Sequence, residues 1–180
     1  MTTPDTILHF WFDELQPAQW WRVDAALDAT IGKRFATVLD QALAGELQHW
    51  RESAEGRLAE IIVLDQFSRN IHRGTPRAFA ADNVALVLAQ EALRAQADVT
   101  LPPPRRAFLY MPFMHSESPR IHEQSIRLFD QPGLEGNLDA ARRHKAIIDR
   151  FGRYPHRNAI LGRPSSVEEE AFLQTPGSSF

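Results

Sequence analysis

The residues with the clearest chemical potential lie between positions 150 and 163, in the run Arg-Phe-Gly-Arg-Tyr-Pro-His-Arg-Asn-Ala-Ile-Leu-Gly-Arg. Around one predicted helix start, this run gathers Arg153, His156, Arg157 and Asn158. A guanidinium group offers N–H donors in a fixed fork, and a helix N-terminus adds unpaired backbone N–H groups. Such a concentration of donors favours a carboxylate, a phosphate or an acidic side chain as its partner.

His156 is the residue of this run that could move a proton. The sequence places it in the first turn of a short helix, between Arg153 and Arg157. Neighbouring positive charge disfavours protonation, so we expect a neutral imidazole that can accept a proton. Two interpretations stay open. The segment is either a ligand site or a structural clamp whose arginines pair with Glu117, Asp65 or helix C-termini.

A second polar segment, Asp65–Asn70, lies inside the apolar stretch 57–71, which predicts a central buried helix. Asp65 and Arg69 are four residues apart and therefore share one helix face. Burying either charge alone costs several kcal/mol, so each needs a partner. The pair either fixes the packing of this helix or forms one wall of a polar pocket that also holds residues 153–158.

A third segment follows Pro112, which we expect to end a short helix. His115 and Glu117 then fall in a connection, where they could act as a general base and its orienting partner or as two metal ligands. Metal motifs are incomplete, since His122 is followed by Ile126 at the position where a metalloprotease helix needs its second histidine. We therefore predict no metal and no cofactor.

Other side chains lie at positions typical of a core. His144 shares a helix face with Ala140 and Ile147, which is typical of a hydrogen-bonded core histidine. The adjacent pair Trp20 and Trp21 cannot both point inward, so one of them is expected to rim a groove.

Composition narrows the class of protein. The 180 residues are 43% hydrophobic and 24% charged, as in ordinary globular domains, and the absence of cysteine excludes disulfides and thiolate sites. A net charge of −3 without a continuous basic face argues against nucleic acid as the main partner. No signal peptide and no run of about 18 apolar residues is present, so we predict a cytoplasmic protein without membrane contact. The oligomeric state stays open.

The helix signals cover almost the whole chain, and no alternating strand pattern is present. Boundary signals that combine a capping residue with proline, glutamate or glycine are Thr3-Pro4, Thr75-Pro76, Ser118-Pro119, Asn137, Gly152 and Ser166 with Glu169. The Thr75-Pro76 signal predicts a long helix to about Ala97, and Asn137 predicts the start of another that ends near Phe151. We expect an all-α fold of stacked antiparallel helix pairs, with residues 1–174 as a single domain and 175–180 frayed.

Over nearly its whole length the sequence resembles family 924 of the bacterial domains of unknown function. The resemblance rests on the motifs Phe10-Trp11-Phe12, Leu64 to Asn70, Arg73 to Ala80, Phe113 to Glu117 and Arg150 to Arg163. It implies a helical arrangement similar to tetratricopeptide helix pairs and brings no activity with it. The matched polar positions are Asp65, Arg69, Asn70, His115, Glu117, Arg153, His156, Arg157 and Asn158.

The leading functional hypothesis is a polar pocket that binds a small anionic ligand, in either a passive binding protein or a metal-independent enzyme. Arg69, Arg153 and Arg157 would donate to the ligand, while Asn70 and Asn158 orient it.

In the enzyme version of this hypothesis, His156 or His115 is the general base, and Glu117 orients it. The competing hypothesis is a tetratricopeptide-like module for a protein or peptide partner, in which the Arg/His/Asp cluster is a structural clamp.

Overall fold

The computed structural model describes residues 2–180, and every regular element in that range is helical. The α-helices are α1 (Pro4–His9), α2 (Ala25–Leu43), α3 (Ala54–Ile62), α4 (Ser68–Ile71), α5 (Asp82–Arg94), α6 (Pro103–His115), α7 (Pro119–Phe129), α8 (Glu135–Phe151) and α9 (Val167–Leu173). Short 3₁₀ turns lie at Pro17–Trp21, Gln48–Glu52, Pro76–Phe79, Ala97–Thr100 and Pro155–Arg157. The all-α prediction is confirmed. Among residues 2–180, no helix combines the length and the apolar character that crossing a bilayer requires.

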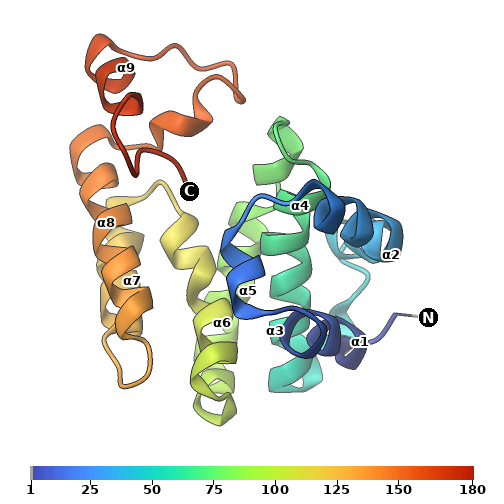
Figure 1. The fold of residues 1–180 in the computed structure, drawn as a ribbon. Coiled ribbons are helices and arrows are strands. Elements are labelled where there is room, and N and C mark those ends of the chain that lie inside the picture. The colour runs from blue at the N-terminus through green and yellow to red at the C-terminus, as the bar shows by residue number, and fades with distance from the viewer. Residues whose placement is uncertain (1) are drawn as a thin grey trace.

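Helices that follow one another pack side by side, most extensively α7 with α8, α6 with α7 and α5 with α6 (Figure 1). The central helix α3 touches α1, α5 and α6, and its residues from Leu58 to Ile62 are almost completely buried. One apolar core extends from Ile7 in α1 to Ala141 in α8. A smaller cluster of Ile147, Ile148 and Tyr154 joins α8 to the segment that precedes α9.

The predicted buried helix over 57–71 is present, but it contains a wider turn. Between α3 and α4 the chain forms a π-helical turn at Val63–Phe67, with helical backbone at both ends. Such turns insert one residue into the helix and change the direction of the side chains around it. Asp65 lies inside this turn and is 1% exposed.

Helix α6 continues through Pro112, so the prediction that this proline ends the helix is wrong. Proline cannot donate to the carbonyl four residues earlier, at Phe108. Residues 107–114 are nevertheless all buried, and their packing offsets the missing hydrogen bond. His115 is consequently the last residue of a rigid helix instead of part of a connection.

Two helix starts also differ from prediction. Thr75-Pro76 opens only the turn Pro76–Phe79, and α5 begins afresh at Asp82, so there is no single helix to Ala97. Helix α8 begins at Glu135, which places Asn137 inside the helix instead of at its cap. By contrast, Thr3 caps α1, Gly152 ends α8 with a φ of 69°, and Ser166 with Glu169 forms a capping box, all as predicted.

Candidate functional site

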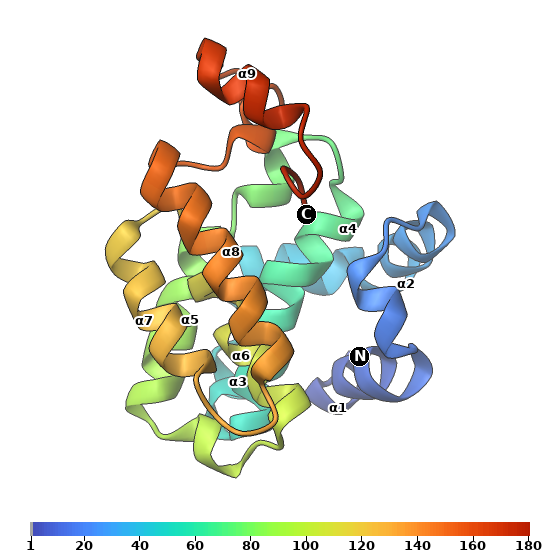
Figure 2. The same cartoon turned by 60° about the vertical axis from the view of Figure 1, so that its left-hand side comes forward.

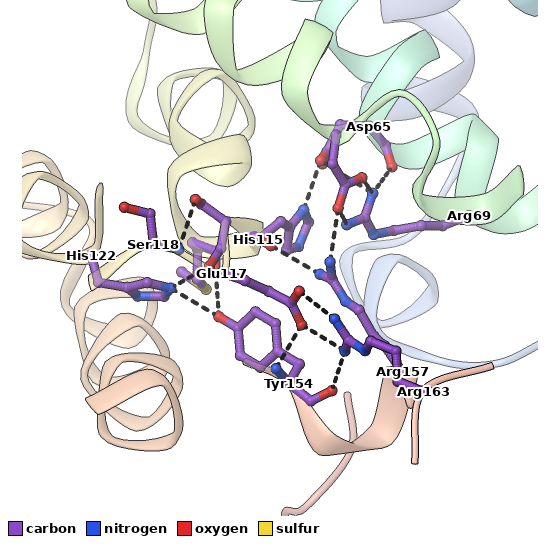
Figure 3. A network of polar contacts seen from close by, with 12 residues as sticks. Asp65, Arg69, His115, Glu117, Ser118, His122, Tyr154, Arg157 and Arg163 are labelled. Atoms are coloured by element: carbon purple, nitrogen blue, oxygen red, sulfur yellow. Dashed lines mark hydrogen bonds and ion pairs between the residues drawn. The ribbon is translucent and has the colours of Figure 1, made fainter. Parts of the chain in front are cut away.

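The three polar segments meet where the π-helical turn, the end of α6 and the turn Pro155–Arg157 converge (Figure 3). At the centre, Nδ1 of His115 lies 2.7 Å from Oδ1 of Asp65. The other carboxylate oxygen of Asp65 accepts a hydrogen bond from Gln66 Nε2 at 2.6 Å. The buried carboxylate therefore holds the His115 ring in one orientation.

This pairing fixes the protonation state of both groups. Burial alone would raise the pKa of Asp65, but the adjacent His115 ring and Arg69 guanidinium lower that pKa to about 2. Burial, and then Arg69, lower the pKa of His115, against the opposing effect of Asp65. At neutral pH the ionised carboxylate accepts the Nδ1 proton of a neutral imidazole. The Nε2 lone pair has no hydrogen-bond partner among residues 2–180, and the ring lines a cleft.

Asp82 is the residue that the sequence analysis missed. Its carboxylate accepts from Arg69 Nη1 and Nη2 at 2.8 and 3.0 Å and from Arg157 Nη1 at 3.0 Å. Arg157 also donates a hydrogen bond from Nη2 to the main-chain oxygen of His115, at 3.0 Å. Nothing in the sequence separated Asp82 from an ordinary acidic residue in the first turn of a helix. We call Asp65, Arg69, Asp82, His115 and Arg157 the cleft wall.

The cleft beside this wall has a volume of about 730 Å³. Its basic lining residues are Arg22, Arg69, Arg73, Arg143 and Arg157, together with His115, His144 and His156. Within residues 2–180, no aspartate or glutamate lines it. The apolar part of the lining includes Trp20, Trp21, Phe79, Met111, Met114 and Ile160. The cleft therefore suits an anion that also carries an apolar group.

Carboxylates behind the lining compensate most of this positive charge. Arg22 pairs with Asp24, Arg73 with Asp28, and the two wall arginines with Asp65 and Asp82. Arg143 forms no ion pair with any other residue in the described range 2–180. Five arginines against four aspartates leave an excess of one positive charge, which matches a ligand with a single negative charge.

Two further histidines face the cleft in the neutral state. Burial, and then Arg157, lower the pKa of His156 to about 4, and its Nδ1 is buried without a partner in the described chain. His144 donates through Nδ1 to the Ala140 main-chain oxygen at 2.8 Å, as expected for a hydrogen-bonded histidine. Burial lowers the pKa of His144 to about 3.

Glu117 has a different role from the predicted one. Figure 3 shows that it points away from His115, toward Arg163 and the backbone of Tyr154. Glu117 accepts from Arg163 Nη1 and Nη2 at 2.7 and 2.9 Å and from Tyr154 N at 2.7 Å. The orienting partner of His115 is thus Asp65 and not Glu117. The reason is that α6 ends at His115, and the extended backbone of Ser116 turns Glu117 to the other side.

Arg153 and Asn158 also lie outside the cleft. Arg153 forms two hydrogen bonds of 2.7 Å to Glu169, and Asn158 bonds to Ser165 and Arg163. Arg153 and Arg157 were both expected to donate to one ligand, but α8 ends before Arg153 and Pro155 starts a new turn between them. We call Glu117, Arg153, Asn158, Arg163 and Glu169 the clamp.

The other predicted site residues either line the cleft or lie directly behind its lining. Those that line the cleft are Arg69, Asn70, His115, His156 and Arg157. Asp65 lies directly behind His115, and Asn70 donates from its side chain to Asp28 at 2.8 Å. Across residues 2–180, no group of three or more histidine, aspartate and glutamate side chains is arranged to hold a metal ion.

Comparison with known proteins agrees with this fold. The structure of the protein of unknown function ATU0120 from Agrobacterium tumefaciens superimposes with a TM-score of 0.91 at 37% sequence identity. The match covers 95% of this chain and 96% of that one. No curated protein matches the chain significantly. The model of the family described as bacterial protein of unknown function (DUF924) matches residues 7–177, and the chain therefore belongs to the DUF924 family.

Proposed function

We propose that the cleft binds a small organic anion and that His115, oriented by Asp65, acts on it as a general base, in the manner of a metal-independent enzyme. The observation that carries this proposal is the 2.7 Å contact between a buried carboxylate and His115 Nδ1, with Nε2 free at the edge of an arginine-lined cleft. A base needs this tautomer, because the free ring nitrogen must hold the lone pair.

The neighbouring charges suit proton transfer. When Nε2 takes a proton, the imidazolium that forms is stabilised by the Asp65 carboxylate at its other nitrogen. The proton would come from water or from an acidic O–H or C–H group of the ligand. Arg157 and Arg69 each keep N–H groups that are not bonded to Asp82 or Asp65, and these can stabilise negative charge that develops on the ligand.

Imidazole ¹H–¹⁵N NMR tests the proposal directly. Propionate, benzoate and inorganic phosphate are titrated into the wild-type protein, the His115→Gln variant and the Arg153→Ala variant. We expect a carboxylate to shift the resonances of His115 and His156 with the same dissociation constant in wild type and in Arg153→Ala, because Arg153 lies in the clamp. Unchanged resonances with every anion would overturn the binding proposal.

The general-base role needs its own measurement. The ¹⁵N chemical shifts report the tautomer, and we expect the proton on Nδ1 of His115 in wild type. In Asp65→Asn the pKa of His115 should fall further, because the carboxylate that favours the protonated ring is gone. A proton found on Nε2 in the free protein would contradict the assignment.

A protein or peptide partner is the second candidate, and one observation favours it. Trp21 and Val23, at the cleft mouth, are 60% and 72% exposed, and exposed apolar side chains of this size often mark interaction sites. A peptide would contact this mouth, whereas a small acid would reach His115. Loss of binding in Trp21→Ala with unchanged His115 resonances would favour the peptide.

A further inference from the structure

The side chain of Phe180 lines the cleft. After α9 the chain turns back, and in both Figure 1 and Figure 2 its drawn end lies between α8 and α4. The ring centroid of Phe180 lies 3.7 Å from that of His144, 4.6 Å from that of His156 and 5.1 Å from that of Tyr154. These three rings form a site for an aromatic group, which we call the aromatic subsite.

The aromatic subsite is apolar in character at neutral pH, although two of its rings are imidazoles. Burial keeps His144 and His156 neutral, with pKa values lowered to about 3 and about 4. The Tyr154 hydroxyl is fully buried and already bonded to the Met114 main-chain oxygen and to His122. The subsite therefore offers ring faces and edges instead of charges, and an aromatic group packs well against such surfaces.

Apart from these ring contacts, few interactions hold Phe180 in the aromatic subsite. The side-chain hydrogen bonds of residues 175–180 all lead back to α9, from Thr175 to Phe172 and from Ser178 to Leu173. Phe180 itself is 54% exposed. A competing aromatic ring has to break few interactions to displace it.

The aromatic subsite and the Arg157 guanidinium are close enough for one small molecule to contact both. The guanidinium carbon of Arg157 lies 4.9 Å from the Tyr154 ring centroid, and the Phe180 ring lies 5.1 Å from the same point. Their separation is at most the sum of these two distances, about 10 Å. An aryl ring joined to a carboxylate by a short carbon linker, as in 3-phenylpropionate, spans this separation when the carboxylate reaches the guanidinium.

We propose that the aromatic subsite binds the aryl ring of the ligand, that the ligand class is aryl-substituted monocarboxylic acids with a short linker, and that Phe180 occupies the subsite until such an acid displaces it. The inference rests on the proposed function for the binding of the ligand carboxylate, and it adds the site that binds the aryl ring of the ligand. The excess of one positive charge in the cleft agrees with a monocarboxylate.

Calorimetric titration tests the inference with three acids of the same anionic group: propionate, 3-cyclohexylpropionate and 3-phenylpropionate. In Phe180→Ala the dissociation constant of 3-phenylpropionate should fall by about threefold to tenfold, the equivalent of one aromatic pair. The constant for propionate should stay within about twofold of wild type, because propionate does not reach the subsite. Val167→Ala, which removes an exposed apolar side chain from α9, is the matched control and should change neither constant.

The outcomes separate the two proposals. If propionate and 3-phenylpropionate bind equally well and Phe180→Ala changes neither, the aromatic subsite is wrong while the anion site stands. If no acid binds to wild type or to Phe180→Ala, both proposals fail. Equal gains for the cyclohexyl and phenyl acids would reduce the subsite to a general apolar pocket and would overturn the aryl assignment.

Discussion

The cleft wall and the clamp both consist largely of arginine and acidic residues, but they differ in whether their charged groups face the cleft. In the clamp, the hydrogen bonds of Glu117, Arg153 and Glu169 lead to other protein groups, and none of these residues lines the cleft. In the cleft wall, Arg69, Arg157 and His115 are held from behind by Asp65 and Asp82 and keep one side toward the cleft. The clamp joins segments of the chain, whereas the wall presents oriented groups to the cleft.

The comparison shows that closeness in sequence does not decide which role a residue takes. His115 and Glu117 are two residues apart but belong to different regions, because a helix ends between them. Arg153 and Arg157 diverge because Pro155 starts a new turn between them. Whether a charged residue of this fold belongs to the cleft wall or to the clamp therefore depends on the direction of the backbone at that residue and not on its sequence motif.

The largest effect is expected from Asp82→Ala in the cleft wall. The change leaves the buried Arg157 and the largely buried Arg69 without their shared carboxylate. Removing one partner of a buried ion pair costs roughly 3 to 5 kcal/mol of unfolding free energy. Urea denaturation measures this loss, and Asp139→Ala, which removes an exposed carboxylate on α8, is the control. A loss smaller than that of Glu117→Gln in the clamp would contradict this expectation.

Acid should affect the histidines His144 and His156 of the cleft and the carboxylate of the clamp in different pH windows. The pKa values of His144 and His156 are lowered from 6.5 to about 3 and about 4, so the unfolded chain binds protons first as pH falls. Their contribution is complete above pH 6.5 and is lost as pH falls toward 4 for His156 and toward 3 for His144. Between pH 6.5 and pH 4 the loss is roughly 3 kcal/mol per histidine. Unfolding free energies measured from pH 7 to pH 4 should therefore decrease, and His156→Gln should flatten this decrease.

Glu169 of the clamp should respond only at lower pH. Its hydrogen bonds from Arg153 lower its pKa from 4.5 to about 2, so its contribution is complete above pH 4.5 and is lost as pH falls toward 2. Glu169→Gln should leave the slope between pH 7 and pH 5 unchanged. A change of slope in that range would contradict the assignment of the upper window to the histidines.

In the clamp, Glu117→Gln should cost less than Asp82→Ala. Glutamine keeps the length of the side chain and one acceptor, but it loses the charge opposite Arg163. The expected loss is roughly 1 to 3 kcal/mol, as for a hydrogen bond to a charged group. Carboxylate affinity, measured by calorimetry, should not change. A clear loss of affinity without loss of stability would move Glu117 into the ligand site.

The smallest effect on stability is expected from Arg143→Ala at the cleft rim. Arg143 is exposed, so its removal should change the unfolding free energy by no more than about 0.5 kcal/mol. Affinity for carboxylates should nevertheless fall by a few fold, and the fall should be smaller at high salt. Arg142→Ala, the neighbouring exposed arginine that pairs with Asp139, is the control and should leave affinity unchanged.

The sequence predicted the helical class and the caps well, because both depend on local signals such as Thr3, Gly152 and the pair of Ser166 and Glu169. It failed at Pro112, where tertiary packing outweighs one lost hydrogen bond, and at Asn137, which lies inside a helix that starts earlier. It also had no means to find the π-helical turn that holds Asp65.

For the site, the sequence determined which side chains are available, and it predicted one polar pocket shared by Asp65–Asn70, His115, Glu117 and residues 153–158. Only the tertiary structure decided that Asp65 orients His115, that Asp82 joins Arg69 to Arg157, and that Glu117, Arg153 and Asn158 lie in the clamp. The reason is physical. Capping and helix periodicity act over a few residues, whereas the pairing of buried charges depends on which segments distant in sequence approach each other and from which side.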